Sequence, residues 1–236
     1  MRSTFIKICG ITQPADARLA FNLGAGAIGL NFVAGPRKIS PVIAAEILSA
    51  LPQSCCVVAL IHIPDSAAMV GLETILESPQ VTHLQLYGNC AGLARFGPVA
   101  ASLKKRKPFK IWPVMRISSL TDVLRIAASV AELGCRPDEV VLDAFTPVAL
   151  GGTGNRFDWN WLQTASVEGR LTGLPPMILA GGLNAENVGD AISLVKPWGV
   201  DVSSGVEEPG RPGIKSPDLM ARFVQAVRIA DEDAIS

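Results

Sequence analysis

Eight short runs of β-branched and aliphatic residues recur along this 236-residue chain, and they constrain its fold more than any other feature. Most of the runs are apolar throughout rather than alternating, which is typical of strands buried on both faces of a parallel sheet. Segments with helical spacing separate them. Helix-capping signals such as Ser-Pro at 40–41 and 216–217, Asn184 at the start of 184–195, and Gly134 mark several helix ends. The runs are 5–10, 27–32, 55–62, 83–87, 110–116, 139–144, 176–182 and 199–204.

Alternating strands and helices predict βα units and a parallel sheet. Eight such units in a chain of this length match the size of a (β/α)8 TIM barrel. We therefore expect an α/β protein in which residues 1–236 form one domain built on an all-parallel, eight-stranded barrel. A doubly wound open sheet is the alternative, and it is less favoured because no G-x-G-x-x-G motif follows the first run.

Charge and cysteine content narrow the class of protein. Lys and Arg total 21, as do Asp and Glu, so the zero net charge argues against nucleic-acid or membrane partners, which need a basic excess. The five cysteines are odd in number and lack C-x-x-C spacing, as expected for reduced thiols in a cytoplasmic protein. We find no signal peptide or membrane-spanning run, and the two histidines lack metal-binding spacing, so we expect no metal.

The carboxyl ends of the predicted strands are where a barrel of this kind would carry its active site. Two glycine-containing segments, Gly181-Gly182 and Ser203-Ser204-Gly205, follow the last two runs. Backbone N–H groups in such loops can approach an anion closely, so they indicate a phosphate site, although two tight turns are the plainer alternative. Residues 151–159, GGTGNRFDW, could hold the same phosphate or cover the site. The strand ends also carry Cys9, Asn31, His62, Tyr87, Arg116 and Asp143.

Asp143 and Cys9 are the two candidates for proton transfer. Asp143 ends an apolar run, where loss of hydration would raise its pKa and suit it to act as a general acid. Capping of the next loop is its alternative role. Cys9 could be a small, inert core residue. As a thiolate at the barrel mouth it could instead remove a proton from carbon, provided that a nearby cation or dipole lowered its pKa.

Arg37 and Asp201 are candidates for substrate binding. Arg37 follows the second run, where it could pair with a second ligand carboxylate or simply be a solvated surface residue. Asp201 lies within the last run, where it could accept hydrogen bonds from a sugar hydroxyl or from a neighbouring loop.

Five segments in order, KICGIT, GPRKIS, LDAF with GGTGNRFDW, ILAGGLNAENV and GVDVSSGVEEPGRPGIK, together resemble the phosphoribosylanthranilate isomerase family of tryptophan biosynthesis. The resemblance spans essentially the whole chain. It implies a (β/α)8 enzyme that needs no cofactor and rearranges N-(5-phosphoribosyl)anthranilate, an aldose derivative, into a 1-deoxyribulose phosphate that still carries anthranilate.

The same resemblance implies roles for individual residues. Cys9 corresponds to the general base and Asp143 to the general acid. Arg37 would contact the anthranilate side and Asp201 the ribose, while Gly181, Gly182, Ser203, Ser204 and Gly205 would hold the phosphate.

Two departures from the family pattern keep other interpretations open. Tyr87 stands where the family commonly has histidine, and Pro113 where its fifth strand commonly carries lysine. The chain could act on another phosphosugar, or it could be a catalytically idle barrel that binds phosphorylated metabolites. Retention of Cys9 and Asp143 favours the isomerase. We expect a small-molecule phosphosugar as its partner, and either a monomer or a homodimer.

Overall fold

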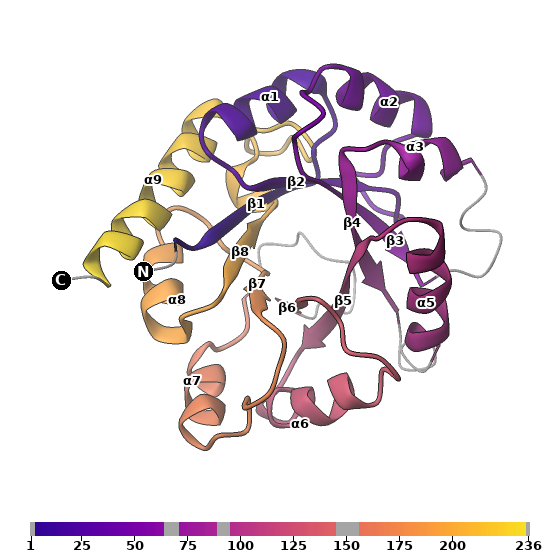
Figure 1. The fold of residues 1–236 in the computed structure, drawn as a ribbon. Helices are drawn as coiled ribbons and strands as arrows, with labels where there is room; N and C mark the ends of the chain where they lie inside the picture. Colours follow the sequence, from indigo (N-terminus) through magenta and orange to yellow (C-terminus); the bar gives the residue numbers. More distant parts are fainter. Residues whose placement is uncertain (1–2, 64–70, 89–94, 145–155, 235–236) are drawn as a thin grey trace.

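The computed structural model describes residues 3–63, 71–88, 95–144 and 156–234, and its centre is a closed barrel of eight parallel strands (Figure 1). The strands pair in chain order, and the first also pairs with the last. Each strand overlaps one of the eight apolar runs, so the predicted (β/α)8 barrel is confirmed. The strands are β1 Phe5–Cys9, β2 Ala27–Asn31, β3 Val57–His62, β4 Val81–Tyr87, β5 Lys110–Ile117, β6 Val140–Ala144, β7 Met177–Leu179 and β8 Gly199–Val202.

Helices surround this barrel on its outside (Figure 1). The sequence pattern gave no helix prediction between β3 and β5, where the structure has α3 and α5. The first of these spans only five residues, and the second has Gly97 and Pro98 in its first turn, which weakens the helical signal. The helices are α1 Pro14–Asn22, α2 Pro41–Ser49, α3 Glu73–Glu77, α5 Phe96–Arg106, α6 Leu120–Ala131, α7 Asn160–Val167, α8 Val188–Val195 and α9 Pro217–Asp233, with a 3-10 turn, η2, at Ser204–Val206.

The Ser-Pro signals cap helices as predicted. Ser40 Oγ accepts a hydrogen bond from the Ile43 N–H at 3.3 Å, and Ser216 Oγ accepts one from the Leu219 N–H at 3.4 Å. Asn184 differs, because its side chain accepts bonds from the backbone of a turn that precedes α8. The expected helix start at Asn184 is therefore wrong by one turn.

Alternation along the strands divides the core into two layers. In β1, Ile6 and Ile8 pack outward against the helices, whereas Phe5 and Cys9 belong to the cluster inside the barrel. Val58, Val114, Val141 and Ile178 from other strands fill that interior, so the barrel encloses a packed core. Pro113 lies between two inward-facing residues of β5, Trp112 and Val114, and therefore on the outer face of its strand.

Aromatic rings close the amino-terminal end of the barrel interior. The Phe5 and Trp198 rings stack with centroids 4.6 Å apart, and the His83 ring meets Trp112 edge-on at 4.8 Å. Burial, together with the positive charge of Lys110, lowers the pKa of His83 to about 4. These contacts give His83 a packing role at the end of the barrel opposite to the carboxyl ends of the strands.

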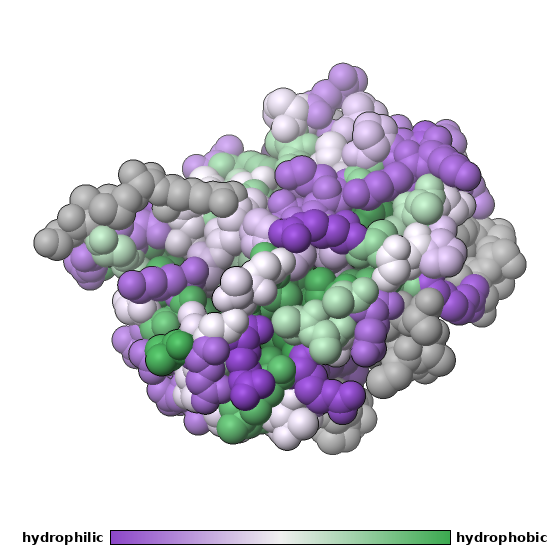
Figure 2. Space-filling model, turned by 60° about the horizontal axis from the view of Figure 1, so that its bottom comes forward, coloured by the Kyte–Doolittle hydropathy of each residue, from purple (hydrophilic) through white to green (hydrophobic). Residues whose placement is uncertain are grey.

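The surface carries no strong segregation of polarity on the face drawn in Figure 2, where hydrophilic and hydrophobic residues are interspersed. None of the helices that the structure describes is both long and apolar enough to cross a membrane. Among the same residues, no three His, Cys, Asp or Glu side chains are grouped so that they could hold a metal ion.

Candidate active site

A hollow opens at the carboxyl ends of the strands, with a volume of about 590 Å³ when the open solvent at its mouth is included. Most of the site residues expected from the sequence meet here, although they come from distant parts of the chain. The lining residues are Cys9, Gly10, Asn31, Arg37, Leu60, Gln85, Tyr87, Asp143, Ala180, Gly181, Gly182, Leu183, Asp201, Ser203 and Ser204.

Three predicted positions fall outside this lining, and one of them is Arg116, near the end of β5. His62 ends β3 but is exposed. Gly205 lies behind the lining, where it packs so closely on the Leu183 carbonyl that a Cβ atom would overlap it. Of the segment 151–159, which was predicted as a phosphate loop or a cover, residues 151–155 lie outside the described residues, and residues 156–159 do not line the hollow.

Cys9 is buried at the carboxyl end of β1. Its thiol fills space that is free because Gly29, on the neighbouring strand, has no side chain. A Cβ atom on Gly29, its register partner in β2, would lie 2.7 Å from the Cys9 Sγ. Burial raises the pKa of the Cys9 thiol, and the Asp201 carboxylate raises it further, while the ammonium groups of Lys7 and Lys215 oppose both effects. The thiol is thus placed at the mouth of the barrel with cations nearby.

Lys7 is a residue of this site that sequence reasoning missed. It lies two positions before Cys9 on the same face of β1, and its side chain is fully buried inside the barrel. Its Nζ lies 2.6 Å from Oδ2 of Asp201, which is its register partner in β8. The available signal was a lysine inside an apolar strand, in phase with the cysteine.

Asp143 reaches the hollow from β6, across the barrel from β1. Burial raises its pKa to about 6, and the neighbouring Asp201 adds to the increase, although Arg116 and Lys7 oppose it. The increase expected from loss of hydration is therefore present. A carboxyl group with this pKa is partly protonated near neutral pH and can donate a proton.

The loops after β7 and β8 supply the polar backbone of the hollow. Gly181 and Gly182 adopt φ values of +86° and +67°, which only glycine adopts without strain, and Asn187 Nδ2 donates a 2.9 Å bond to the Gly182 carbonyl. The Ser203 hydroxyl is buried without a hydrogen-bond partner in the part of the chain that the structure describes. It is therefore available to a ligand, as are the N–H groups of a glycine turn.

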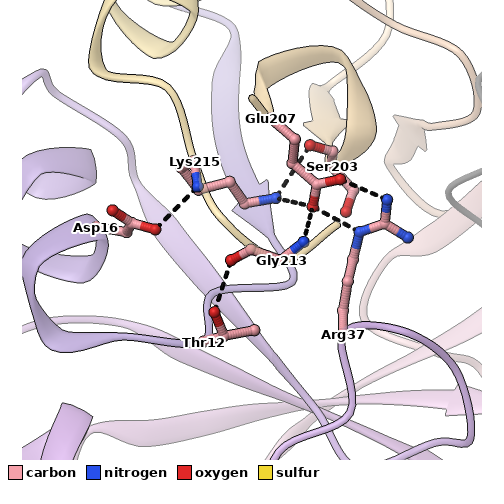
Figure 3. Close-up of polar contacts among 7 residues, drawn as sticks. All are labelled: Thr12, Asp16, Arg37, Ser203, Glu207, Gly213 and Lys215. Carbon is pink, nitrogen blue, oxygen red and sulfur yellow. Dashed lines mark hydrogen bonds and ion pairs between the residues drawn. The ribbon is translucent and has the colours of Figure 1, made fainter. Parts of the chain in front are cut away.

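Arg37 also borders the hollow, but a buried carboxylate already orients it (Figure 3). Its Nε donates to Oε1 of Glu207 at 2.7 Å and its Nη2 to Oε2 at 2.6 Å, a two-pronged pair. The Lys215 Nζ and the Gly213 N–H each approach the same Oε1 at 3.0 Å. Burial alone would raise the pKa of Glu207, yet these donors and cations hold it below its usual value. Sequence reasoning predicted the position of Arg37 but missed Glu207 and Lys215.

The Lys215 network joins three loops at the mouth of the barrel. Lys215 Nζ donates to the Ser203 carbonyl at 3.0 Å, and its backbone N–H donates to Asp16 Oδ2 at 3.0 Å. Thr12, from the loop after β1, donates to the Gly213 carbonyl at 2.6 Å (Figure 3). These bonds fix the loop after β8 against the loop after β1 and against α1, and the Arg37–Glu207 pair fixes it against the loop after β2.

Tyr87, which departs from the expected family pattern, lines the hollow and accepts a 3.2 Å hydrogen bond from Gln85 Nε2. Burial raises the pKa of its hydroxyl well above the usual value, and the nearby Asp143 and Cys9 act in the same direction. Tyr87 thus presents a neutral hydroxyl to the hollow. Pro113 does not line it.

An eight-stranded parallel barrel with polar groups converging at the carboxyl ends of its strands places this chain in the class of (β/α)8 barrel enzymes. Comparison with known proteins narrows the class. Residues 6–226 match the family described as N-(5'phosphoribosyl)anthranilate (PRA) isomerase. The chain belongs to this family.

Individual relatives resemble the chain over nearly its full length. The N-(5'-phosphoribosyl)anthranilate isomerase of Moorella thermoacetica is 37% identical over 96% of this chain and 91% of its own. The crystal structure of the isomerase from Thermotoga maritima superposes with a TM-score of 0.75 at 28% identity, covering 95% of this chain and 98% of that one. A phosphoribosyl anthranilate isomerase in complex with reduced 1-(o-carboxyphenylamino)-1-deoxyribulose 5-phosphate gives a TM-score of 0.72 at 26% identity, with coverages of 95% and 98%.

Proposed function

We propose that this protein is a phosphoribosylanthranilate isomerase acting in tryptophan biosynthesis. It converts N-(5'-phosphoribosyl)anthranilate into 1-(2-carboxyphenylamino)-1-deoxyribulose 5-phosphate, an aldose–ketose isomerisation of the Amadori type. One observation carries the proposal: a buried thiol on β1 and a carboxyl group with a raised pKa on β6 reach one hollow, beside two polar glycine-containing loops. Membership of the isomerase family gives that arrangement its substrate.

Asp143 and Cys9 divide the proton transfers between them. Asp143 donates a proton to the ribose ring oxygen, and the bond from this oxygen to C1' breaks as the anthranilate nitrogen forms an iminium ion. The Cys9 thiolate then removes the proton on C2', which yields an enolamine that tautomerises to the ketone. A well-placed general acid or base contributes a factor of about 10²–10⁴ to the rate.

The remaining groups hold the two anionic ends of the substrate. Gly181, Gly182, Ser203 and Ser204 form the phosphate site, with Gly205 packed behind them against the Leu183 carbonyl. The Ser203 hydroxyl, which has no hydrogen-bond partner among the described residues, supports this assignment. Arg37 binds the anthranilate carboxylate in the orientation set by Glu207. Asp201 uses its Oδ1, which makes no hydrogen bond within the described part of the chain, to accept one from a ribose hydroxyl.

An activity assay tests the proposal. Phosphoribosylanthranilate is generated in solution, the purified protein is added, and the loss of substrate fluorescence is followed beside a sample without enzyme. Cys9→Ser and Asp143→Asn should each lower kcat by about 10²-fold or more, because each removes one proton-transfer group. Cys135→Ser, at an exposed cysteine away from the hollow, is the matched control and should keep full activity.

Absence of turnover by the wild-type protein would refute the proposed reaction. If the wild type is active but either variant keeps near-normal kcat, the role assigned to that residue is wrong. Circular dichroism of each variant separates loss of chemistry from loss of fold.

We further propose that residues 1–236 form one domain, since the first and last strands pair to close the barrel. The protein acts in the cytoplasm on a small phosphorylated substrate, as a monomer or a homodimer. The isomerase of Thermotoga maritima is described as dimeric, which supports testing the second state first by sedimentation.

A further inference from the structure

Lys7 is a charged residue on the inner face of β1, and its full burial is unusual for a lysine. None of its side chain is exposed, and lysine is rarely buried in this way without a partner. Its partner is Asp201, whose Oδ2 lies 2.6 Å from the lysine Nζ across the β1–β8 pairing. The two charges are thus fixed to adjacent strands that close the barrel.

Stability does not account for this pair. Removing two charges from water costs several kcal/mol, and replacing a buried ion pair with well-packed apolar residues is often neutral or stabilising. Much of the rest of the interior is apolar, including Val58, Val114, Val141 and Ile178. A barrel interior of this kind would pack without ions, so the pair calls for a functional explanation.

Cys9 supplies that explanation, because it is the next residue on the same face of the same strand. Lys7 and Cys9 both point into the barrel, where the positive charge of Lys7 lowers the pKa of the Cys9 thiol. Asp201 also borders the hollow that Cys9 lines. Thiol, ammonium and carboxylate therefore lie together on the inner faces of β1 and β8, next to the candidate active site.

We propose that Lys7, held in place by Asp201, is a positioning residue that stabilises the Cys9 thiolate by its positive charge. The inference deepens the proposed function, since it explains how a buried thiol serves as a base, and it rests on that function for its catalytic meaning. Lys7 acts through Cys9 and does not line the hollow itself.

The charges balance through the proton transfer. The Cys9 thiol first loses its proton to solvent, leaving a thiolate beside the Lys7 ammonium. The thiolate then takes the C2' proton, the electron pair of the broken C–H bond forms the new carbon–carbon double bond, and the iminium π electrons return to nitrogen. Cys9 ends as a thiol, and Lys7 keeps its proton throughout.

Other titratable groups around Cys9 set the sign of the expected effects. Lys7 and Lys215 lower the pKa of the Cys9 thiol, whereas Asp201 raises it. Tyr87 and Asp143 face the same hollow from β4 and β6. Removal of the Lys7 charge should therefore make the thiol harder to ionise, and removal of the Asp201 charge should make it easier.

The test measures thiol ionisation in substrate-free protein, so it does not depend on the proposed reaction. Iodoacetamide labelling of Cys9 is followed against pH by mass spectrometry of the Cys9 peptide. Lys7→Met should shift the labelling midpoint upward by about one pH unit or more, because a nearby ammonium group is lost. Lys7→Arg should restore most of the shift, and Lys105→Met, on the exposed face of α5, is the matched control with no shift.

Asp201→Asn provides a second variant should Lys7→Met fail to fold. Asparagine keeps an oxygen that accepts a bond from Lys7 but removes the negative charge, so the midpoint should move downward. An unchanged midpoint in the folded Lys7→Met variant, or an upward shift in Asp201→Asn, would overturn the proposal. If the shifts occur as expected but the wild type does not turn over phosphoribosylanthranilate, the proposed function fails and the thiolate-stabilising role stands.

Discussion

Asp143 illustrates how a single buried residue in this barrel trades stability for chemistry. Its carboxyl group is almost fully removed from water, and its pKa of about 6 is well above the usual 3.8. The folded protein therefore binds the proton more tightly than the unfolded chain does. Arg37 shows the opposite arrangement, because its charge is matched by Glu207, whose pKa is lowered by two cations. Asp143 is therefore suited to give up a proton, whereas Glu207 is suited to stay ionised beside Arg37.

The raised pKa of Asp143 makes stability depend on pH. Well below pH 3.8 the carboxyl group is protonated in both states, but as pH rises towards and through 6 the folded protein loses stability, because the group ionises freely in the unfolded chain and at a cost when buried. Asp143→Asn removes this cost, so its free energy of unfolding relative to the wild type should increase by up to about 3 kcal/mol between pH 4 and pH 8. Urea unfolding at several pH values measures this difference. A pH-independent difference, equal to that of the exposed control Asp233→Asn, would contradict the prediction.

At the scale of elements, the turns after the strands decide where the ligand-facing backbone lies. Gly181 follows β7 with φ +86°, and a Cβ atom there would come within 2.6 Å of the Ala144 Cβ and backbone N and within 3.1 Å of Asp143 Oδ1. The turn thus touches the end of the neighbouring strand β6. Neither of the two contacts with Ala144 can be relieved by a flexible side chain, so the backbone itself would have to move.

Gly181→Ala should consequently disturb the site more than the fold. We expect KM to rise and kcat/KM to fall by about 10-fold or more, because displacement of reacting groups by even 1 Å is costly. Gly173→Ala is the matched control, since Gly173 also has positive φ, +81°, but has nothing within 4 Å of its Cβ position. It should lose only about 1–2 kcal/mol of stability and keep its kinetics. Equal kinetic losses in the two variants would show that backbone strain alone explains the effect.

At the scale of the whole molecule, the two ends of the chain close the structure together. The β1–β8 pairing completes the barrel, and α9 packs beside the start of β1, so both termini lie on the same side (Figure 1). Asp231 near the end of α9 accepts a 3.0 Å bond from the Thr4 N–H, and its carboxylate also binds the Thr4 hydroxyl. Arg228 Nη1 adds a 2.5 Å bond to Ser3 Oγ. These contacts fasten the last helix to the first strand.

Asp231→Ala should loosen this closure. Hydrogen bonds to a charged group contribute about 1.5–3 kcal/mol each, and the backbone N–H of Thr4 would lose its acceptor. We expect the free energy of unfolding in urea to fall by about 1–3 kcal/mol. Glu232→Ala, at the exposed neighbouring position, is the control and should change it by no more than about 0.5 kcal/mol. If both variants have the same stability, the contact between the chain ends does not hold the barrel closed.

The sequence by itself determined the eight strands, the barrel and the placement of Cys9 and Asp143 at strand ends. These features depend on periodicity and apolarity within a few residues, which any short window of the chain contains. The same reasoning underlies the glycine turns after β7 and β8. It failed at Asn184 and at α5, where local signals competed with one another.

Only the tertiary structure decided which buried charges meet. Lys7 pairs with Asp201, 194 positions away, and Arg37 pairs with Glu207, 170 positions away. Such pairs depend on strand register and barrel closure, which bring distant segments together with ångström accuracy, and no local pattern encodes that register. The positions of the candidate acid and base could therefore be predicted from sequence, whereas the charges that set their ionisation could be found only in the closed barrel.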